Sequence, residues 1–410
     1  MRFGHFFYPM NLDAKRDYQA IATCLDEAEL VEQLGFDAIW IAEHHFAGEA
    51  VYGDALVFGA AVAVKTQRVL IGLGVVEMAL HNPVQLAIQT ALLDNLSRGR
   101  LVVGIGRGSN YNAFEYIGFG TSVAAGLAQL SEAEDLLVKA WTTEALNYQG
   151  AFWQVTFPAV RPRPYQQPHP PLARACLSEE SIKAMARLGR PVLLRGRSVE
   201  HLAATIALYR DTMHAAGFDA ASIDNALDQS WLWCELHIAE TDAQALEEFL
   251  PKFHQASRYI ADMRQRWNPP DVPLPKPPLP LPRTAYGPTP SRTANEALVG
   301  SPARVTEQIA LLRDVGVRNL MLTNRGLMSP EQTRSSLRLL SEKVMPQFAE
   351  YRKNKRHFIA GPFRSATLKT PLGHPRDADG SPSTPRLLAK ATRSKAWCGF
   401  ARSGHADQDG

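Results

Sequence analysis

The chain has 410 residues, 45% of them hydrophobic, so it is long enough to bury a large core. No stretch reaches the run of about 18 uninterrupted apolar residues that is typical of a membrane-spanning helix, so we expect no such helix and no membrane partner. The formal net charge is only +3, and after residue 351 Lys and Arg outnumber Asp and Glu by 12 to 4. A nucleic-acid-binding role would therefore rest on that tail alone, and we expect none.

The cysteines predict neither disulfides nor a metal site. Cys24, Cys176, Cys234 and Cys398 form no C-x-x-C pair and no spacing typical of zinc ligands. Residues 1–13 lack the long apolar core and the cleavage site of a secretion signal. We therefore expect reduced thiols, no metal and a cytoplasmic protein.

Strand and helix patterns alternate through the first half of the chain. Apolar runs predict strands at residues 2–8, 37–42, 69–76 and 100–105. Helical spacing is expected at residues 18–34, 52–65, 82–96 and 124–141. Strands that are apolar at nearly every position are typical of parallel sheets buried on both faces.

The second half continues the alternation after an interruption. Residues 146–157 predict an inserted hairpin, because they alternate in polarity before a Pro-rich loop. Further strands are expected at residues 172–177, 191–195, 231–239 and 317–323. Further helices are expected at residues 179–188, 199–216, from 242 onward, 302–315 and 330–345. Eight strand–helix alternations predict an α/β fold, a (β/α)8 TIM barrel with insertions.

Two segments fall outside the barrel pattern. Residues 268–290 contain 10 of the 28 prolines and predict an extended insertion, placed where a lid over the site would lie. Residues 351–410 lack periodicity and predict a basic, mostly disordered C-terminal tail. We therefore expect one barrel domain over residues 1–350, followed by this tail.

Three groups of motifs, in this order, carry a family resemblance. EHHF follows the second strand at residues 43–46, and LDNLSRGR at 93–100 leads into LVVGIGRG at 101–108. Residues 300–302 (GSP), 316–317 (GV) and 344–346 (VMP) bracket the last strand and its helices. Together they resemble the bacterial-luciferase-like family of flavin-dependent monooxygenases over roughly residues 1–350. The resemblance implies a (β/α)8 barrel, a reduced flavin and often dioxygen.

His44 is the candidate catalytic residue. It follows the second strand, and in such barrels the C-terminal ends of the strands hold the active site. A neutral imidazole exchanges protons near pH 7, which suits a general base. By resemblance His44 matches the family's catalytic histidine, with Glu43 and His45 supporting it. The alternative is that His44 and His45 are both structural and bind loop backbone.

The candidate cofactor-binding residues follow the next three strands. The resemblance implies a non-proline cis peptide at Gly74–Val75, under the flavin ring, where the alternative is an ordinary buried strand. Arg107 matches a phosphate-binding arginine, and its planar fork of donors suits phosphate oxygens. The alternative for Arg107 is a solvated loop side chain. Ser178 and Ser181 match phosphate contacts at a helix start, where the alternative is simple N-capping.

We expect other polar and aromatic residues near the strand ends to have structural roles. Glu77, His81, Arg195 and Arg197 are placed to line the pocket, but a structural role is favoured for each. The tryptophans of the second half are interpreted as core or pocket wall: Trp231, Trp233 and Trp267.

The chain also departs from the luminescent members of the family. Their acidic partner of the catalytic histidine aligns, without gaps, with Ala113, although Tyr111, Asn112 and Glu115 are near. Gly106 replaces a reactive cysteine. A further phosphate-binding arginine of the luminescent enzymes aligns near Ala125 and Gly126, where this chain has no arginine. These changes argue against light emission and leave general flavin chemistry open.

The resemblance implies a monooxygenase that receives reduced FMN from a separate flavin reductase. With dioxygen it would oxidise a small organic substrate, an aldehyde or another apolar carbonyl compound. Two alternatives remain: hydride transfer with a deazaflavin coenzyme in the same fold, and a flavin-binding paralogue without catalysis. A homodimer, or a heterodimer with a paralogue, is expected.

Overall fold

The computed structural model describes residues 1–196, 198–272, 274, 297–324 and 327–349, all within one compact unit that spans residues 1–363. Most of the predicted Pro-rich insertion and the whole predicted tail lie outside the described residues. Arg197 lies outside them too.

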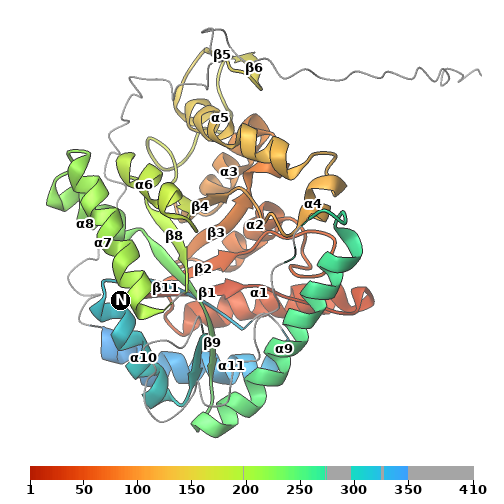
Figure 1. Cartoon of the computed structure of the whole chain (residues 1–410), viewed down its shortest axis with the longest axis vertical. Helices are drawn as coiled ribbons and strands as arrows, with labels where there is room; N and C mark the ends of the chain where they lie inside the picture. Colours follow the sequence, from red (N-terminus) through yellow and green to blue (C-terminus); the bar gives the residue numbers. More distant parts are fainter. Residues whose placement is uncertain (197, 273, 275–296, 325–326, 350–410) are drawn as a thin grey trace, which may run out of the picture. The chain divides into compact units, whose positions relative to one another are not determined.

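Parallel strands close into an eight-stranded barrel in the described part of the chain, as the sequence predicts (Figure 1). In order around the barrel they are β1 (Arg2–Phe7), β2 (Ala38–Ile41), β3 (Leu70–Glu77), β4 (Leu101–Gly106), β7 (Leu172–Ala175), β8 (Val192–Arg195), β9 (Trp231–Ile238) and β11 (Asn319–Thr323). Pairing of β8 with β9 closes the ring, and the short strand β10 (Ala297–Gly300) adds to β9. The predicted hairpin is confirmed as the antiparallel pair β5 (Leu146–Gln149) and β6 (Gln154–Phe157).

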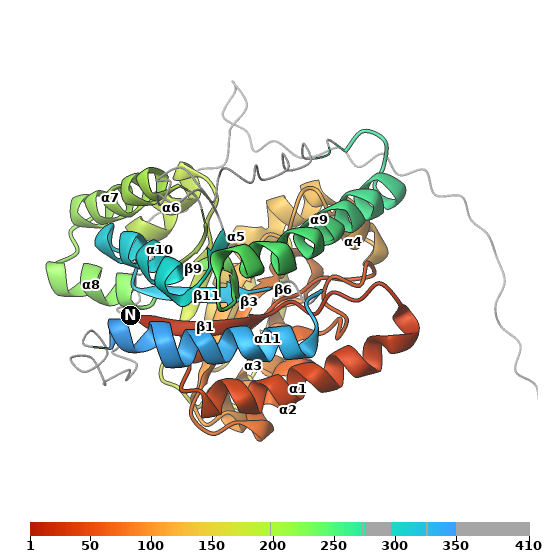
Figure 2. The same cartoon turned by 90° about the horizontal axis from the view of Figure 1, so that it is seen from below.

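Helices surround the barrel, and Figure 2 shows α1 and α11, which contact each other, side by side. The helices are α1 (Asp17–Gln33), α2 (Ala55–Lys65), α3 (Pro83–Leu96), α4 (Ala113–Gly118), α5 (Val123–Thr142), α6 (Glu179–Arg187), α7 (Val199–Ala215), α8 (Ala220–Asp228), α9 (Asp242–Trp267), α10 (Pro302–Asp314) and α11 (Pro330–Leu339). Of the described helices, none is long and apolar enough to cross a membrane.

Tryptophan fills the middle of the barrel. The ring of Trp40 packs against that of Trp231 at a centroid distance of 5.3 Å, and both side chains are buried. Glycine makes room on the neighbouring strands, because a Cβ at Gly4 would lie 2.8 Å from Trp40 Cδ1 and one at Gly72 would overlap its ring. The interior is therefore a packed core, and a ligand site belongs at the strand ends.

The sequence did not predict three short elements, namely α4, α8 and β10. None exceeds nine residues, so each is too short to show lasting periodicity. Of the three, α4 matters most, because it carries a residue of the site.

Candidate active site

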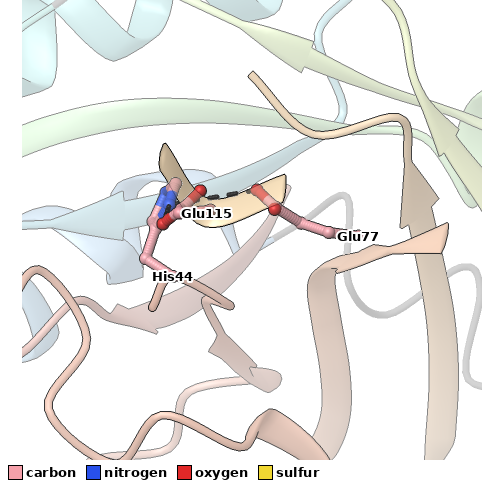
Figure 3. Close-up of side chains that lie close together, drawn as sticks. All are labelled: His44, Glu77 and Glu115. Carbon is pink, nitrogen blue, oxygen red and sulfur yellow. Dashed lines mark hydrogen bonds and ion pairs between the residues drawn. The ribbon is translucent and has the colours of Figure 1, made fainter. Parts of the chain in front are cut away.

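Three ionisable side chains converge at the C-terminal ends of β2 and β3 (Figure 3). His44 follows β2, Glu77 ends β3, and Glu115 lies in the first turn of α4. The Nδ1 atom of His44 lies 3.2 Å from Oε1 of Glu115 and 3.9 Å from Oε1 of Glu77. Both carboxyl groups are buried, and the histidine side chain is 20% exposed. His44 is thus the member of the group that can still reach a ligand.

Glu115 is held by donors on both of its oxygens. The backbone N–H of His45 donates to Oε1 at 2.8 Å, and Nδ2 of Asn112 donates to Oε2 at 3.2 Å. An ionised carboxylate only accepts, so the proton of the His44–Glu115 contact lies on Nδ1 of His44. The ring of Tyr8 packs edge-on against the imidazole at 5.5 Å. The imidazole orientation is therefore fixed from two sides.

The carboxylates around His44 set its charge. Burial acts to lower the pKa of His44, but Glu49, Glu115 and Glu77 outweigh burial and raise the pKa to about 10. Burial acts to raise the pKa of Glu115, but the imidazolium and its hydrogen bonds lower it below the usual range. Burial and the charge of Glu115 raise the pKa of Glu77 well above its ordinary value.

A pKa of about 10 makes His44 an imidazolium near neutral pH, beside the carboxylate of Glu115, and the raised pKa of Glu77 favours the protonated form of that carboxyl group. The sequence argument for a general base starts from a neutral imidazole, whereas Glu49, Glu77 and Glu115 favour the charged form of His44. The cluster holds protons that it can donate.

Glu43 organises a second layer behind the cluster. Its Oε1 accepts hydrogen bonds from His45 Nε2 at 3.0 Å and His81 Nε2 at 2.7 Å, and its Oε2 accepts one from the backbone N–H of Glu77 at 2.8 Å. Burial acts to raise the pKa of Glu43, but the two histidines lower it to about 2. Glu43 and His45 support the site, as the sequence predicts, and His81 joins them.

The acidic partner of His44 lies two residues beyond the position that the ungapped alignment gives. Ala113, the ungapped match, is buried at the start of α4, and Glu115 two residues later reaches His44. The short helix α4 turns this side chain toward the imidazole. A carboxylate close after the Gly-rich end of β4 was the signal that could have identified it. Because Glu115 contacts His44, a missing acidic partner no longer counts against light emission.

The predicted cis peptide at Gly74–Val75 is confirmed. Both residues are half-buried near the end of β3, close in sequence to Glu77. The side chain of Val75 lies against Gly106, where a Cβ would come within 2.6 Å of Val75 Cγ2. A cysteine at position 106 would therefore collide with Val75.

Arg107 and the start of α6 lie at the ends of adjacent strands. Strands β4 and β7 pair in parallel, and a Cβ at Gly106 would lie 3.7 Å from Cβ of Ala175. Arg107 follows Gly106, and Ser178 comes three residues after Ala175, so both leave the same edge of the barrel. The Nε atom of Arg107 is buried and has no hydrogen-bond partner among the described residues. A buried donor without a partner is costly, which favours an anionic ligand there.

Ser178 and Ser181 form an N-capping box on α6. The N–H of Ser181 donates to Oγ of Ser178 at 3.3 Å, and the N–H of Ser178 donates to Oγ of Ser181 at 3.2 Å. Glu179 and Glu180 in the first turn are exposed. The structure thus shows the capping alternative, which is compatible with an anion at the same helix start.

The remaining predicted residues are structural or peripheral. Arg195 is exposed and lies over the ring of Trp233 at 5.5 Å. Trp231 belongs to the core and Trp233 is half-buried, but Trp267 is 57% exposed, so a core position for it is wrong. Trp267 is the last residue of α9 and lies outside the core.

Comparisons with known proteins agree with this geometry. A family profile described as luciferase-like monooxygenase matches residues 1–319. Limonene 1,2-monooxygenase of Rhodococcus erythropolis is 28% identical over 59% of the chain and 62% of its own length. The oxygenase component of the flavin-dependent trigonelline monooxygenase of Acinetobacter baylyi is 29% identical over 42% of the chain and 48% of its length. The alkanal monooxygenase beta chain of Vibrio harveyi is 25% identical over 55% of the chain and 70% of its length. The chain thus spans about half to two thirds of these relatives.

Solved structures share the fold. Monooxygenase RslO1 of Streptomyces bottropensis is 28% identical, with a TM-score of 0.71 over 85% of this chain and 100% of its own. The oxygenating constituent of 3,6-diketocamphane monooxygenase of Pseudomonas putida, in complex with FMN, is 19% identical, with a TM-score of 0.69 over 85% and 98%. A coenzyme F420-dependent tetrahydromethanopterin reductase of Methanopyrus kandleri is 16% identical, with a TM-score of 0.60 over 85% and 99%.

Proposed function

Because the chain belongs to the luciferase-like monooxygenase family, we propose that it takes reduced FMN from a separate flavin reductase and, with dioxygen, oxidises a small organic substrate. The substrate class that we propose is an aldehyde or another apolar carbonyl compound. The observation that carries the proposal is the cluster of His44, Glu77 and Glu115 at the C-terminal ends of the barrel strands, where the glutamates favour the imidazolium form of His44. Redox chemistry beside such a cluster can draw on protons held in place.

The residues present fit FMN. The buried, unpartnered Nε of Arg107 and the start of α6 behind Ser178 leave the same barrel edge and offer donors to a phosphate. Gly74 and Val75, on the neighbouring strand β3, are half-buried at the same end of the barrel and would lie under the ring. When bound, reduced FMN would supply the electrons that activate dioxygen.

Residues of the chain hold the proton for transfer and form apolar walls around the substrate. Because Nδ1–H of His44 is bound to Glu115, the proton for transfer is the one on Nε2. The half-buried side chains of Tyr8, Val75 and Trp233 pack on the apolar cluster around Trp40 at this end of the barrel. Apolar walls exclude water from the reacting centre and favour an apolar substrate.

Relatives support the two-component arrangement. One relative is named an oxygenase component, which fits a partner that reduces the flavin elsewhere. One fold neighbour is named for an FMN complex and another for dependence on coenzyme F420. Hydride transfer with a deazaflavin is therefore the second candidate function, and a catalytically silent flavin-binding paralogue is the third.

The test supplies each reduced cofactor to the full-length protein. A flavin reductase generates reduced FMN, and oxygen consumption and oxygenated product are followed with a panel of aldehydes and cyclic ketones. We expect product that depends on FMN and on dioxygen. Substrate turnover with reduced deazaflavin and without oxygen would favour hydride transfer, and binding without turnover would favour the silent paralogue.

We also propose that a second copy of the chain, or a paralogue, packs on α2 and α3. These contacting helices expose an apolar face that consists of Val57, Val64, Ile88, Leu92 and Leu96. Exposed apolar side chains gathered on contacting helices are typical of an interface. One relative is named a beta chain. Analytical ultracentrifugation should show a dimer that Leu92→Glu dissociates, whereas Leu127→Glu on α5 leaves it intact. A monomeric parent protein would contradict the self-pairing.

A further inference from the structure

The C-terminal end of helix α9 forms hydrogen bonds with the segment that precedes Glu115. The side chain of Asn268 donates to the carbonyl of Tyr111 at 2.7 Å and accepts from the N–H of Phe114 at 3.0 Å. The guanidinium of Arg264 lies over the ring of Tyr111 at 5.9 Å. These contacts fix the chain on both sides of Asn112.

Arg264 also determines how the amide of Asn112 is oriented. Its Nε donates to Oδ1 of Asn112 at 2.8 Å, so the amide NH2 group faces the other way and donates to Glu115. Asn112 is fully buried. A flipped amide would set its oxygen against the carboxylate of Glu115, which is repulsive in a buried site. The guanidinium therefore selects the orientation that keeps Glu115 ionised and in contact with His44.

We propose that Arg264 is a positioning residue that acts through Asn112 and Glu115 on His44. The proposal rests on the proposed function only in assigning His44 to catalysis. Helix α9 thereby acts on the proton-handling group through Asn112, which lies 152 residues from Arg264 in the sequence. Arg264 itself touches neither the substrate nor the cofactor in this scheme.

The influence passes through Asn112, whose Nδ2 donates to Glu115 at 3.2 Å and also lies 3.4 Å from Nδ1 of His44. The charged groups that face His44 are Glu49 from the loop after β2, Glu77 from β3 and Glu115 from α4. Arg264 contacts this group by way of Asn112. Losing Arg264 should weaken the Asn112–Glu115 hydrogen bond, favour protonation of Glu115 and make His44 less basic.

The experiment compares Arg264→Gln with Arg266→Gln in the full-length protein. Arg266 lies in the same last turn, is exposed and stacks on its neighbour Trp267, so it is a matched control for charge and helix position. The pKa of His44 is measured by NMR of its labelled imidazole, with His44→Gln to assign the resonance. Turnover is measured as kcat and KM against pH.

We expect Arg264→Gln to lower the pKa of His44 by about one unit, since a hydrogen bond to a charged group is being weakened. We also expect kcat to fall by about tenfold or more while KM for FMN stays the same. Arg264→Lys should restore part of both effects, and Arg266→Gln should change neither. In combination with Glu115→Gln, the Arg264 substitution should add little, because both act on one path.

An unchanged pKa of His44 in Arg264→Gln would overturn the proposal, even if the melting temperature falls, because the contact would then be only structural. Failure of the proposed function is a separate result. It would show as unchanged turnover in His44→Ala, whereas the NMR titration needs no turnover and still tests the path from Arg264.

Discussion

The proposed site has two halves that the chain completes to different degrees. Around His44 the described residues connect β2, β3, α4 and α9 through hydrogen bonds of Glu43, Asn112 and Glu115, although Oε2 of Glu77 is buried without a hydrogen-bond partner among them. At the ends of β4 and β7, Arg107 keeps a buried donor without a partner among the described residues, and the hydroxyl groups of Ser178 and Ser181 form their hydrogen bonds within the capping box.

Under the proposed function, this difference makes the proton-handling half preorganised and leaves the anion-binding half to be completed by its ligand. Preorganised groups act on the transition state without reorganisation, whereas a donor without a partner contributes most when a ligand supplies one. Substitutions in the first half should therefore change pH behaviour and turnover. Substitutions in the second half should change affinity.

The largest expected effect concerns the charge of His44. Its pKa is raised in the folded protein to about 10, against 6.5 ordinarily, so its stabilising contribution is complete below pH 6.5 and is lost as the pH rises toward 10. The free energy of unfolding should fall over this window by up to about 1.4 kcal/mol per pH unit relative to His44→Gln. Chemical denaturation of both proteins across the window measures this, and parallel profiles would show that the carboxylates do not hold the imidazolium.

The next effect is on turnover. His44→Ala removes the proton donor while leaving Arg107 and α6 untouched, so turnover should fall by about 100-fold or more with FMN affinity nearly unchanged. Steady-state kinetics and fluorescence titration with FMN separate the two quantities. A variant that loses FMN binding instead would make His44 a scaffold residue and would remove the contrast between the halves.

Arg107→Ala should have the converse effect. Loss of a charge-assisted contact costs about 1.5–3 kcal/mol, so FMN should bind about tenfold to over 100-fold more weakly. Riboflavin, which lacks the phosphate, should bind almost as before. Equal losses for the two ligands would place Arg107 away from the phosphate.

The two halves also differ in how far the sequence predicts them. The strand ends were predictable because buried parallel strands are uniformly apolar, and this located His44, Arg107 and Ser178 directly after them. Glu115 was missed, because the six residues of α4 are too few to show a helical period that would indicate its direction. Arg264 leaves no local pattern at all, since its contact is made across the fold. The charge of His44 follows from several carboxylates that meet only in three dimensions.

The smallest effect is expected at Ser178, where two substitutions, one that keeps the N-cap and one that removes it, distinguish capping from anion binding. Aspartate is as good an N-cap as serine, so Ser178→Asp should keep α6 and change the unfolding free energy by less than about 0.5 kcal/mol. Its negative charge would repel a phosphate at the helix start, so FMN affinity should fall by about three- to tenfold while riboflavin affinity stays constant. Ser178→Ala should show the reverse pattern, a stability loss of about 1 kcal/mol with a smaller change in FMN affinity. If Ser178→Asp binds FMN as well as the parent protein, the box on α6 only caps the helix, and the anion contacts belong to Arg107 alone.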